Sequence, residues 1–424
     1  MNPPMDPPPF ELFPIHMCAT TNVQIENYPG AHEVHIPWQA MKHVQDWLKE
    51  FSVQQYQPQE DSFDDDTDED EEMIDGNSED DDSDSLSDFD SSFDESDYEG
   101  EGETSENGQY QHPSQPQDAK QRVKPTNNNR IAYWIPPSSE CLIMENKRGH
   151  VLTHVHRAIV LQKSDLNWVP TGEQVAIKSM SWEHIQASRG RMQEDFLKEI
   201  AALQYFSQFY NGNGETPHVM TANTIMANNS KVFIVMPFCA DGDIVQQVAH
   251  STHRNPFGGI CLSETVAKYW FRQILTGIRQ LQSARLCHRD LSPENFIILD
   301  QNTLVIDFGM CLRIPYSEDG SRHLISKQTP CGKLKHMSPE ISLQQPFDGH
   351  AVDLYSTGTV LLFMLTGTRL EGPIQTDRVF ENGIDLSKWG LSDDAIDLLQ
   401  KMFRFRPIDR LTLDEICAHP FCQS

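Results

Sequence analysis

The stretch HRDLSPEN, which runs from His288 to Asn295, places a carboxylate and an amide on one constrained loop. Asp290 and Asn295 lie five residues apart, and Pro293 between them restricts the backbone. A carboxylate can accept a proton from a hydroxyl group, and an amide oxygen is a hard ligand of the kind that Mg²⁺ prefers. The loop therefore predicts a site where an alcohol loses its proton beside a metal ion.

A second carboxylate, that of Asp307, follows twelve residues after Asn295. The segment FIILDQNTLVI has the pattern of a strand hairpin, and it leads directly into Asp307-Phe308-Gly309. An aspartate at the end of a strand, followed by an aromatic residue and a glycine, offers a metal ligand on a backbone that can pivot. We interpret Asp307 as a second ligand for the metal ion.

Two further residues supply a charge pair upstream. Lys178 ends the apolar strand pattern VAIK, and Glu199 lies in FLKEIAALQ, whose apolar spacing is that of a helix. A Lys–Glu pair between a strand and a helix can hold the ammonium group beside the phosphates of a nucleotide. Either residue alone is a weak signal, because strands often end in lysine.

The elements that position these residues change character along the chain. Strand patterns dominate from about residue 130 to Pro237, as in RAIVLQ, EQVAIKSM and KVFIVMPF, and helical patterns dominate afterwards. In LSETVAKYWFRQILTGIRQLQ, Ser263 can cap a helix. The predicted buried stripe of this helix comprises Val266, Trp270, Phe271, Ile274, Ile278 and Leu281.

Taken together and in this order, VAIK, the helix with Glu199, HRDxxxxN and DFG resemble the protein kinase family, from about residue 132 to the end. MSPE, DLYSTG with Asp353, and the segment around Arg410 resemble later parts of the same family, in which Arg410 would pair with Glu340. The resemblance implies an α+β, bilobal protein-kinase fold. It implies a small β-rich lobe with one main helix over residues 131–238 and a larger α-helical lobe over 239–424.

The resemblance also implies an activity, two cofactors and a role for each residue named above. ATP and Mg²⁺ would bind between the lobes, and the γ-phosphate would pass to serine or threonine of protein substrates. Lys178 would hold the α- and β-phosphates and Glu199 would hold Lys178. Asn295 and Asp307 would bind Mg²⁺, and Asp290 would receive the proton of the substrate hydroxyl. The catalytic loop lacks the Ala/Arg pattern of tyrosine kinases, which favours serine or threonine as the acceptor.

The same resemblance places the nucleoside in IVMPFCADGD. Met236 is similar to the gatekeeper, and adenine would bond the carbonyl of Pro237 and both backbone groups of Cys239. Proline has no N–H, but the implied contact uses only its carbonyl oxygen. Asp243 falls where the family contacts the ribose.

The glycine-rich phosphate loop is the first departure from the family pattern. In ENKRGHVLTHVHRAIVLQ only Gly149 lies near this loop, and the three glycine places fall on Arg148, His150 and Thr153. Side chains at these places crowd the approach of the backbone to phosphates and disfavour positive φ. We expect weaker nucleotide binding, and the alternative is a pseudokinase that acts as a scaffold.

The second departure concerns Ser292, which replaces the lysine that steadies the γ-phosphate in the family. The threonine that holds this lysine in the family is Lys333 here, in TPCGKLKHMSPE. We expect the ammonium group of Lys333 to occupy the space beside Asp290, with Ser292 as its hydrogen-bond partner. The alternative is that Lys333 is a solvated lysine like its neighbour Lys335.

Regulation is predicted from the same segment. Arg289 precedes Asp290 and needs an anion when the loop is ordered, and Thr329 stands where related kinases carry a phosphothreonine. A phosphate on Thr329 would accept paired hydrogen bonds from Arg289, helped by Arg313. The Thr-Pro step favours a proline-directed upstream kinase as activator. The alternative is an ordinary exposed threonine.

Residues 1–130 differ in composition from the rest of the chain. The first 30 or so are rich in proline, and the run from Glu60 to Glu106 contains 25 Asp and Glu with no Lys or Arg. We expect these residues to form a disordered extension, because few apolar groups offset the entropy lost on ordering. Residues 37–51 have helical spacing and would dock on the protein's own domain or on a partner. Four serines in the acidic run are candidates for acid-directed phosphorylation: Ser83, Ser85, Ser87 and Ser92.

Composition excludes several other classes of protein. Most of the net charge of −30 belongs to the acidic run, and no basic face of the kind that nucleic acids require is evident. The nine cysteines show no CxxC pairing pattern, which is typical of reduced, intracellular proteins. The chain contains no secretory signal pattern and no apolar run long enough to span a bilayer. We therefore expect a soluble monomer in the cytoplasm or nucleus.

Overall fold

The structure is a computed structural model, and it describes part of the chain. The predicted helix at 37–51, the acidic run and Gly149 lie outside the described residues. Within them, no helix is both long and apolar enough to cross a membrane. The described residues are 18–23, 27–35, 130–137, 139, 141–145, 151–164, 167–188, 194–210, 214–317, 319–326, 328–370 and 386–423.

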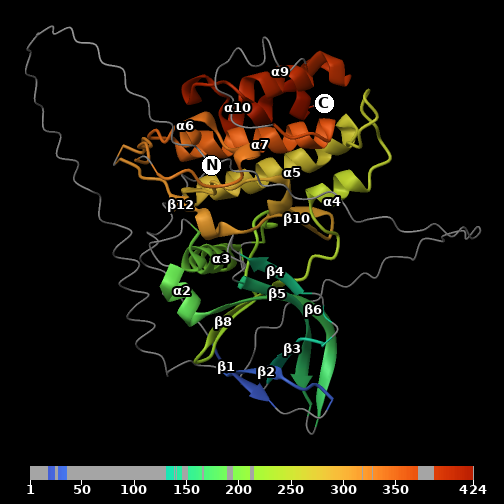
Figure 1. Ribbon diagram of the computed structural model, residues 1–424, viewed down its shortest axis with the longest axis vertical. Helices are drawn as coiled ribbons and strands as arrows, with labels where there is room; N and C mark the ends of the chain where they lie inside the picture. Colours follow the sequence, from blue (N-terminus) through green and yellow to red (C-terminus); the bar gives the residue numbers. More distant parts are fainter. Residues whose placement is uncertain are drawn as a thin grey trace, which may run out of the picture. The chain divides into compact units, whose positions relative to one another are not determined.

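The small lobe is built on one sheet in the strand order β3-β2-β1-β7-β8-β6-β5-β4 (Figure 1). The strands β5 and β6 form a long antiparallel hairpin, in which Val155 is opposite Lys178. The bounds of the eight strands are β1 Cys18–Val23, β2 Ala31–His35, β3 Ile131–Trp134, β4 Cys141–Glu145, β5 Val151–Lys163, β6 Trp168–Ser181, β7 Thr224–Ala227 and β8 Lys231–Pro237.

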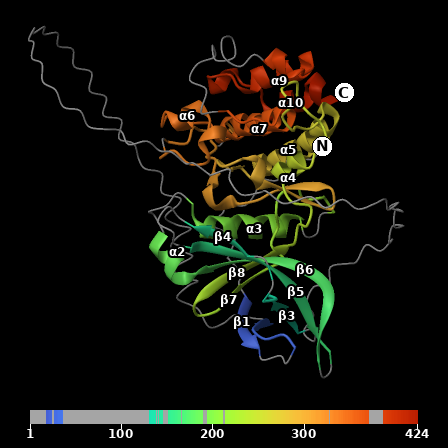
Figure 2. The ribbon, with the colours of Figure 1, turned by 45° about the vertical axis from the view of Figure 1, so that its right-hand side comes forward.

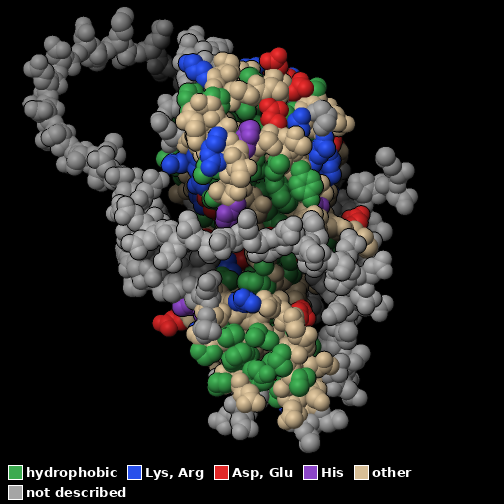
Figure 3. All heavy atoms as spheres, turned by 90° about the vertical axis from the view of Figure 1, so that its right-hand side faces the viewer, with side chains coloured by type: hydrophobic (Ala, Val, Ile, Leu, Met, Phe, Trp, Pro, Cys, Tyr) green, Lys and Arg blue, Asp and Glu red, His purple; other side chains and the backbone are tan. Residues whose placement is uncertain are grey.

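An additional pairing between β3 and β5 closes this sheet on itself. Seven strands, all but β4, then form a hydrogen-bonded ring, and six of them place side chains in one apolar cluster that includes Tyr133, Ile177 and Phe233. Lys178 and its neighbour Ile234 point to the opposite face of the sheet, since successive residues of a strand alternate. The ring thus has its own core and presents Lys178 on its outer side. Apolar side chains also gather on part of the small-lobe surface (Figure 3).

Two of the ring strands come from a stretch that the sequence analysis assigned to the disordered extension. That assignment does not hold for β1 and β2, which pair with each other, with β7 and with β3. Strand pairing and burial of Ala31 offset the entropy of ordering. The Tyr28 and Trp134 rings add an edge-to-face contact with centroids 5.1 Å apart.

The placement of β2 and β3 changes how the acidic run is connected. Glu33 of β2 pairs with Ala132 of β3, and the buried carboxylate of Glu33 forms an ion pair with Arg130. Both ends of the segment 36–129 are therefore fixed on neighbouring strands of one sheet. The acidic run is an insertion between two paired strands of the small lobe.

One helix of the small lobe carries a site residue, as the sequence predicted. The helix α3, Phe196–Tyr210, buries Leu197, Ile200 and Leu203 on the expected face, and Glu199 is buried with them. A shorter helix, α2 at Trp182–Ser188, follows β6 directly.

The large lobe is helical and is arranged around α7, which is buried along almost its whole length (Figure 2). The predicted stripe on α5 is confirmed except at Val266, which is 42% exposed, and Ala267 takes its place. Ser263 occupies the N-cap position without a side-chain hydrogen bond. The helices are α4 Ile244–Ala249, α5 Glu264–Ser283, α6 Pro339–Ser342, α7 Gly349–Thr366, α9 Asp393–Met402, α10 Leu413–Ala418 and α11 Pro420–Gln423.

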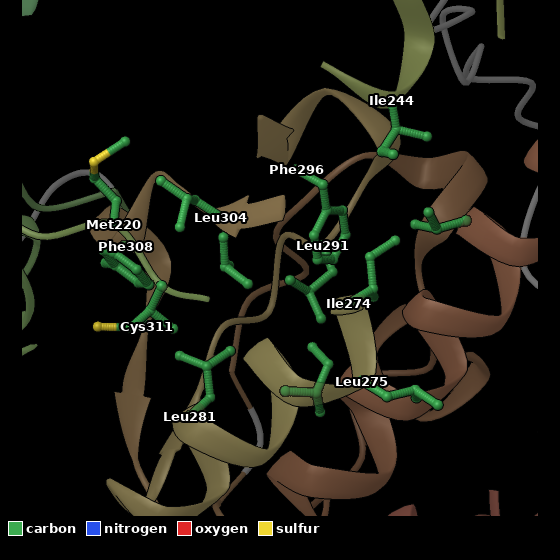
Figure 4. Packing of buried hydrophobic residues seen from close by; sticks show 14 of the residues in the cluster. Met220, Ile244, Ile274, Leu275, Leu281, Leu291, Phe296, Leu304, Phe308 and Cys311 are labelled. Atoms are coloured by element: carbon green, nitrogen blue, oxygen red, sulfur yellow. The ribbon is translucent and has the colours of Figure 1, made fainter. Parts of the chain in front are cut away.

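Short elements connect these helices and carry the polar loops. Figure 4 shows Leu291, from the loop before η2, among the side chains of Ile274 and Phe296, so this loop is fixed from below by apolar packing. The short elements are strands β9 Leu286–Cys287, β10 Phe296–Leu299, β11 Asn302–Val305 and β12 Leu312–Arg313, with 3-10 turns η2 Pro293–Asn295, η3 Phe308–Met310, η4 Leu334–His336, η5 Leu386–Trp389 and η6 Pro407–Asp409.

Candidate active site

Lys178 and Glu199 form a buried ion pair between β6 and α3. The ammonium nitrogen Nζ of Lys178 lies 2.8 Å and 2.7 Å from the two carboxylate oxygens of Glu199. Burial alone would lower the pKa of Lys178, but the charges of Glu199 and Asp307 raise it above its usual value. The lysine is therefore held as a cation in the place where the sequence analysis put it.

Asp307, a residue of the large lobe, lies next to the pair of Lys178 and Glu199. Its Oδ1 lies 3.8 Å from Lys178 Nζ, and its backbone has the left-handed φ of 66°. The following Phe308 is fully buried, with its ring centroid 5.3 Å from that of Phe206 on α3. The amide of Asp195, just before α3, donates to the carbonyl of Gly309 at 2.9 Å. The helix with Glu199 and the turn with Asp307 are thus packed in one fixed arrangement.

Asp353 of α7 anchors the catalytic loop. Its carboxylate is buried and accepts the backbone N–H groups of His288 at 2.7 Å and Arg289 at 2.9 Å. Arg289 has φ of 70°, a conformation that costs a non-glycine residue free energy. The two charge-assisted hydrogen bonds offset this strain and fix the position of the next residue, Asp290.

Asp290 and Asn295 meet across the loop, as their spacing predicted. The side-chain nitrogen of Asn295 donates to the carbonyl oxygen of Asp290 at 2.6 Å and approaches its Oδ2 at 3.3 Å. This orientation leaves the amide oxygen of Asn295 as the atom suited to a metal ion. Burial raises the pKa of Asp290 to about 6, although Lys333 opposes the increase. Asp290 is consequently a stronger base than an exposed aspartate.

Lys333 lies beside the catalytic loop with its ammonium group on Ser292. Its Nζ donates to Ser292 Oγ at 2.7 Å, and its backbone N–H donates to Asp290 Oδ1 at 3.1 Å. The preceding Gly332 has φ of 86°, and a Cβ there would lie only 2.7 Å from the carbonyl oxygen of Arg289. Glycine therefore permits the close approach that brings Lys333 to this position.

Two residues around Lys333 were missed by sequence reasoning. Glu294 accepts from Lys333 Nζ at 3.1 Å and from Arg369 at 2.5 Å. The pKa of Glu294 falls to about 2, because the attraction of Lys333 and the other favourable contacts outweigh burial. Glu294 stands within the motif already examined, but nothing in the sequence links Arg369 to it across the fold.

The predicted nucleoside contacts lie where β8 ends and the chain enters α4. Met236 and Pro237 are the last residues of β8, and Cys239 is partly buried, with burial raising the pKa of its thiol to about 12. Asp243 accepts the backbone N–H of Gln246 at 2.9 Å and caps α4. Of the three predicted glycine places, Arg148 and His150 lie outside the described residues, whereas Thr153 lies on β5 opposite Met144 of β4.

The residues present fit Mg²⁺ with a nucleotide. Asp307 Oδ1 is buried and accepts no hydrogen bond from the part of the chain that the structure describes, which leaves a carboxylate oxygen for a cation. Asn295 offers a second hard oxygen from the adjoining loop, and Lys178 offers an ammonium group to phosphates. Carboxylate and amide oxygens together with phosphate are the usual ligands of Mg²⁺ in such sites.

The two predicted regulatory residues lie in different environments. Arg289 is buried, with its guanidinium 5.8 Å from the ring centroid of Phe347, whereas Thr329 is exposed. The thiol of Cys331, two residues after Thr329, lies within the electrostatic field of Arg289 and Lys198. A phosphate on Thr329 would thus lie near the cations Arg289 and Lys198.

The predicted pair that closes the activation segment is formed. Arg410 donates to both carboxylate oxygens of Glu340 at 2.6 Å and 2.7 Å, and both side chains are almost fully buried. Arg410 also donates to the backbone carbonyl groups of Arg404, Phe405 and Ala351. This network fixes the end of the segment that contains Lys333.

Comparisons with known proteins agree with this geometry. The chain is 27% identical over 301 residues to CBL-interacting protein kinase 20 of Oryza sativa subsp. japonica. The aligned region covers 68% of this chain and 59% of that protein. It is 29% identical over 262 residues to the serine/threonine-protein kinase ATG1c of Arabidopsis thaliana, covering 59% of this chain and 32% of that protein. It is 28% identical over 259 residues to the maternal embryonic leucine zipper kinase of Xenopus laevis, covering 59% and 35%.

The matched region falls within the part of the chain that forms the two lobes. The chain spans between 32% and 59% of the length of these three relatives. Residues 166–422 match the protein kinase domain, and they include Lys178, Asp290 and Asp307. The chain belongs to the protein kinase family.

Proposed function

We propose that the chain is an active protein kinase that transfers the γ-phosphate of ATP to serine or threonine of protein substrates. The observation that carries this proposal is the convergence of Lys178, Asp290, Asn295 and Asp307, with Lys178 already paired to Glu199. Mg²⁺, when bound, supplies charge neutralisation for the phosphates. Each of these side chains then lies where it can bind phosphate, bind the metal ion or accept a proton.

Asp290 orients the acceptor hydroxyl and takes its proton, and its raised pKa suits this role. Lys178 holds the nucleotide phosphates as a cation fixed by Glu199. Lys333 directs an ammonium group to the space beside Asp290, where the γ-phosphate would be transferred. At an effective dielectric constant near 20, a charge about 4 Å from a phosphate contributes about 4 kcal/mol. We infer that Lys333 replaces the lysine that the family carries at the position of Ser292.

The proposal extends to regulation by phosphorylation. Thr329 is exposed and therefore accessible to another kinase, and Arg289 supplies a buried cation on the catalytic loop. A phosphate between them would order the activation segment through charge-assisted hydrogen bonds. The Thr-Pro step favours a proline-directed activator.

The test uses the full chain with labelled ATP, Mg²⁺ and a generic acceptor protein. We expect incorporation of phosphate into serine and threonine, and we expect Asp307→Asn to abolish it. Nucleotide binding, measured by the shift in Tm, accompanies the activity assay. A chain that binds nucleotide but gives no more incorporation than Asp307→Asn would instead be a pseudokinase.

A further inference from the structure

Basic side chains gather around Glu294 on the surface beside Asp290. Lys333 and Arg369 both contact the single carboxylate of Glu294, and Lys335 follows on the exposed turn η4. Lys335 is exposed, and 43% of the Lys333 side chain and 28% of the Arg369 side chain are accessible. Three cations therefore lie beside Glu294, and Asp243 and Asp290 are further carboxylates in the field of Lys333.

The pKa of the buried His336 imidazole reflects these charges. Its pKa falls to about 4, first because of burial and then because Arg369, Lys333 and Lys335 lie nearby. The carboxylate of Glu294 acts against them. His336 itself is neutral and bonded to Thr359, so it adds no charge to this surface.

An acceptor peptide that brings its hydroxyl to Asp290 comes close to this surface, because the backbone N–H of Lys333 contacts Asp290 Oδ1. Lysine and arginine here attract carboxylates and repel cations on such a peptide. Glu294 would ordinarily attract a basic peptide, but Lys333 and Arg369 already neutralise it. The preferred acceptor is therefore a serine or threonine with acidic neighbours.

The chain itself contains such a peptide. The run from Glu60 to Glu106 is densely acidic and contains serines with acidic neighbours, such as Ser83, Ser85, Ser87 and Ser92. Its two ends are fixed to β2 and β3 of the same molecule. The residues between His35 and Ser83 span at most ~170 Å, several times the radius of a domain, so the tether permits access to the site. Attachment to the same chain also gives the peptide a high effective concentration.

We propose that the surface formed by Lys333, Lys335 and Arg369 selects acidic acceptor peptides, and that the serines of this chain's own acidic insertion are modified there in cis. The inference rests on the proposed kinase function. A serine Oγ attacks the γ-phosphorus of ATP and forms a P–O bond, while the bond to the β–γ bridging oxygen breaks. ADP leaves with that electron pair, and Asp290 takes the serine proton.

The test is autophosphorylation of the full chain, mapped by mass spectrometry over a dilution series. We expect phosphate on serines within residues 78–97 at a rate per molecule that does not change with dilution. Lys335→Glu should lower that rate about fivefold, the effect of losing and reversing one exposed charge. Lys231→Glu, an equal charge change on an exposed small-lobe strand, should leave it unchanged.

Two synthetic acceptors test selectivity in the same assay. One has the sequence of residues 78–97, and in the other each Asp and Glu is replaced by Lys. The acidic peptide should have the lower KM, and Lys335→Glu should raise that KM about fivefold without changing kcat. Preference for the basic peptide, or an unmodified insertion in a chain that phosphorylates other acceptors, would overturn the proposal.

A binding measurement separates this inference from the kinase activity. It uses the full chain with the acidic residues of 78–97 replaced by amides, with and without Lys335→Glu, and the labelled acidic peptide. Binding that weakens about fivefold in Lys335→Glu supports the docking surface even if no phosphate is transferred. Absence of binding contradicts the surface even if the chain is an active kinase.

Discussion

In the proposed kinase reaction, Lys333 and Ser292 take the part of the lysine–threonine pair that the resemblance to the protein kinase family implies. The ammonium group reaches Ser292 from the activation segment, whereas the family's lysine reaches its threonine from the catalytic loop. Charge at a point in space matters to a phosphate, and the chain position of the residue that supplies it does not. The cost is that the charge depends on an ordered activation segment.

Exchange of these two residues is the direct test of their roles. We expect Lys333→Thr to lower kcat by about two orders of magnitude while ATP binding persists, because a charge worth several kcal/mol is lost from the transferred phosphate. Adding Ser292→Lys should restore most of kcat, since the ammonium group returns from the other side. Lys335→Thr serves as the matched control, assayed with a neutral peptide. Unchanged turnover in Lys333→Thr would refute the role of Lys333.

The sequence predicted contacts between polar residues where these residues are close along the chain. Asp290 and Asn295 share a loop, and the short loop itself brings them together. The proximity of Lys333 to Ser292 followed from reading two changed positions as one exchange. Arg369 was not predicted, because its approach to Glu294 depends on how α7 ends, and no local pattern encodes that approach.

At the level of elements, the buried pair between Glu340 and Arg410 holds the activation segment to the end of the large lobe. Removing one partner leaves the other charge buried without compensation, which is strongly unfavourable. We expect Arg410→Ala to lower the free energy of unfolding by about 3–5 kcal/mol, measured by urea denaturation. Arg279→Ala removes an exposed pair with Asp414 and should cost less than ~1 kcal/mol. Equal effects of the two variants would contradict this account.

The strands β1 and β2 lead to a different prediction. Deleting residues 1–36 exposes the edge of β7 and the cluster around Ala31, so we expect Tm to fall by several degrees. Replacing residues 57–124 by a short Gly-Ser linker should leave Tm almost unchanged, because every strand of the ring lies outside this range. The measurement is thermal unfolding of the two variants and of the full chain under the same conditions. A small lobe that is equally stable without residues 1–36 would show that the ring does not need these strands.

These strands also show the limit of prediction from the sequence. The helix α3 and the strands β6 and β8 have strong periodic patterns, and the structure confirms them. The strands β1 and β2 are short and lie next to proline-rich and acidic segments, so composition alone indicates disorder. Their stability comes from pairing with β7 and β3, which are distant in sequence.

For the molecule as a whole, two buried histidines make stability depend on pH. The pKa of His336 and that of His350 both fall to about 4, in each case mainly because of burial. The unfolded chain binds protons at these residues near pH 6.5, whereas the folded chain does not. Stability is therefore greatest above pH 6.5 and decreases as the pH falls toward 4, by up to about 3 kcal/mol for each histidine.

His350 is the better residue for a test, because its two ring nitrogens make no hydrogen bond to described residues. We expect His350→Phe to reduce the loss of stability between pH 7.5 and pH 5, measured by urea denaturation at both values. His253→Phe, at an exposed histidine, should retain the full dependence. The same loss in both variants would contradict the proposed origin.

The pairing of β1 with β7 has a consequence for biosynthesis. Ala19 is aligned with Ala227, so about half of the polypeptide must leave the ribosome before the ring can close. Contacts between residues so far apart form slowly, and the unpaired strand edges remain available to other chains in the meantime. Assembly of the small lobe during translation should therefore wait for β7 and β8, and a chaperone that shields β1 and β2 until then would raise the yield of the folded kinase.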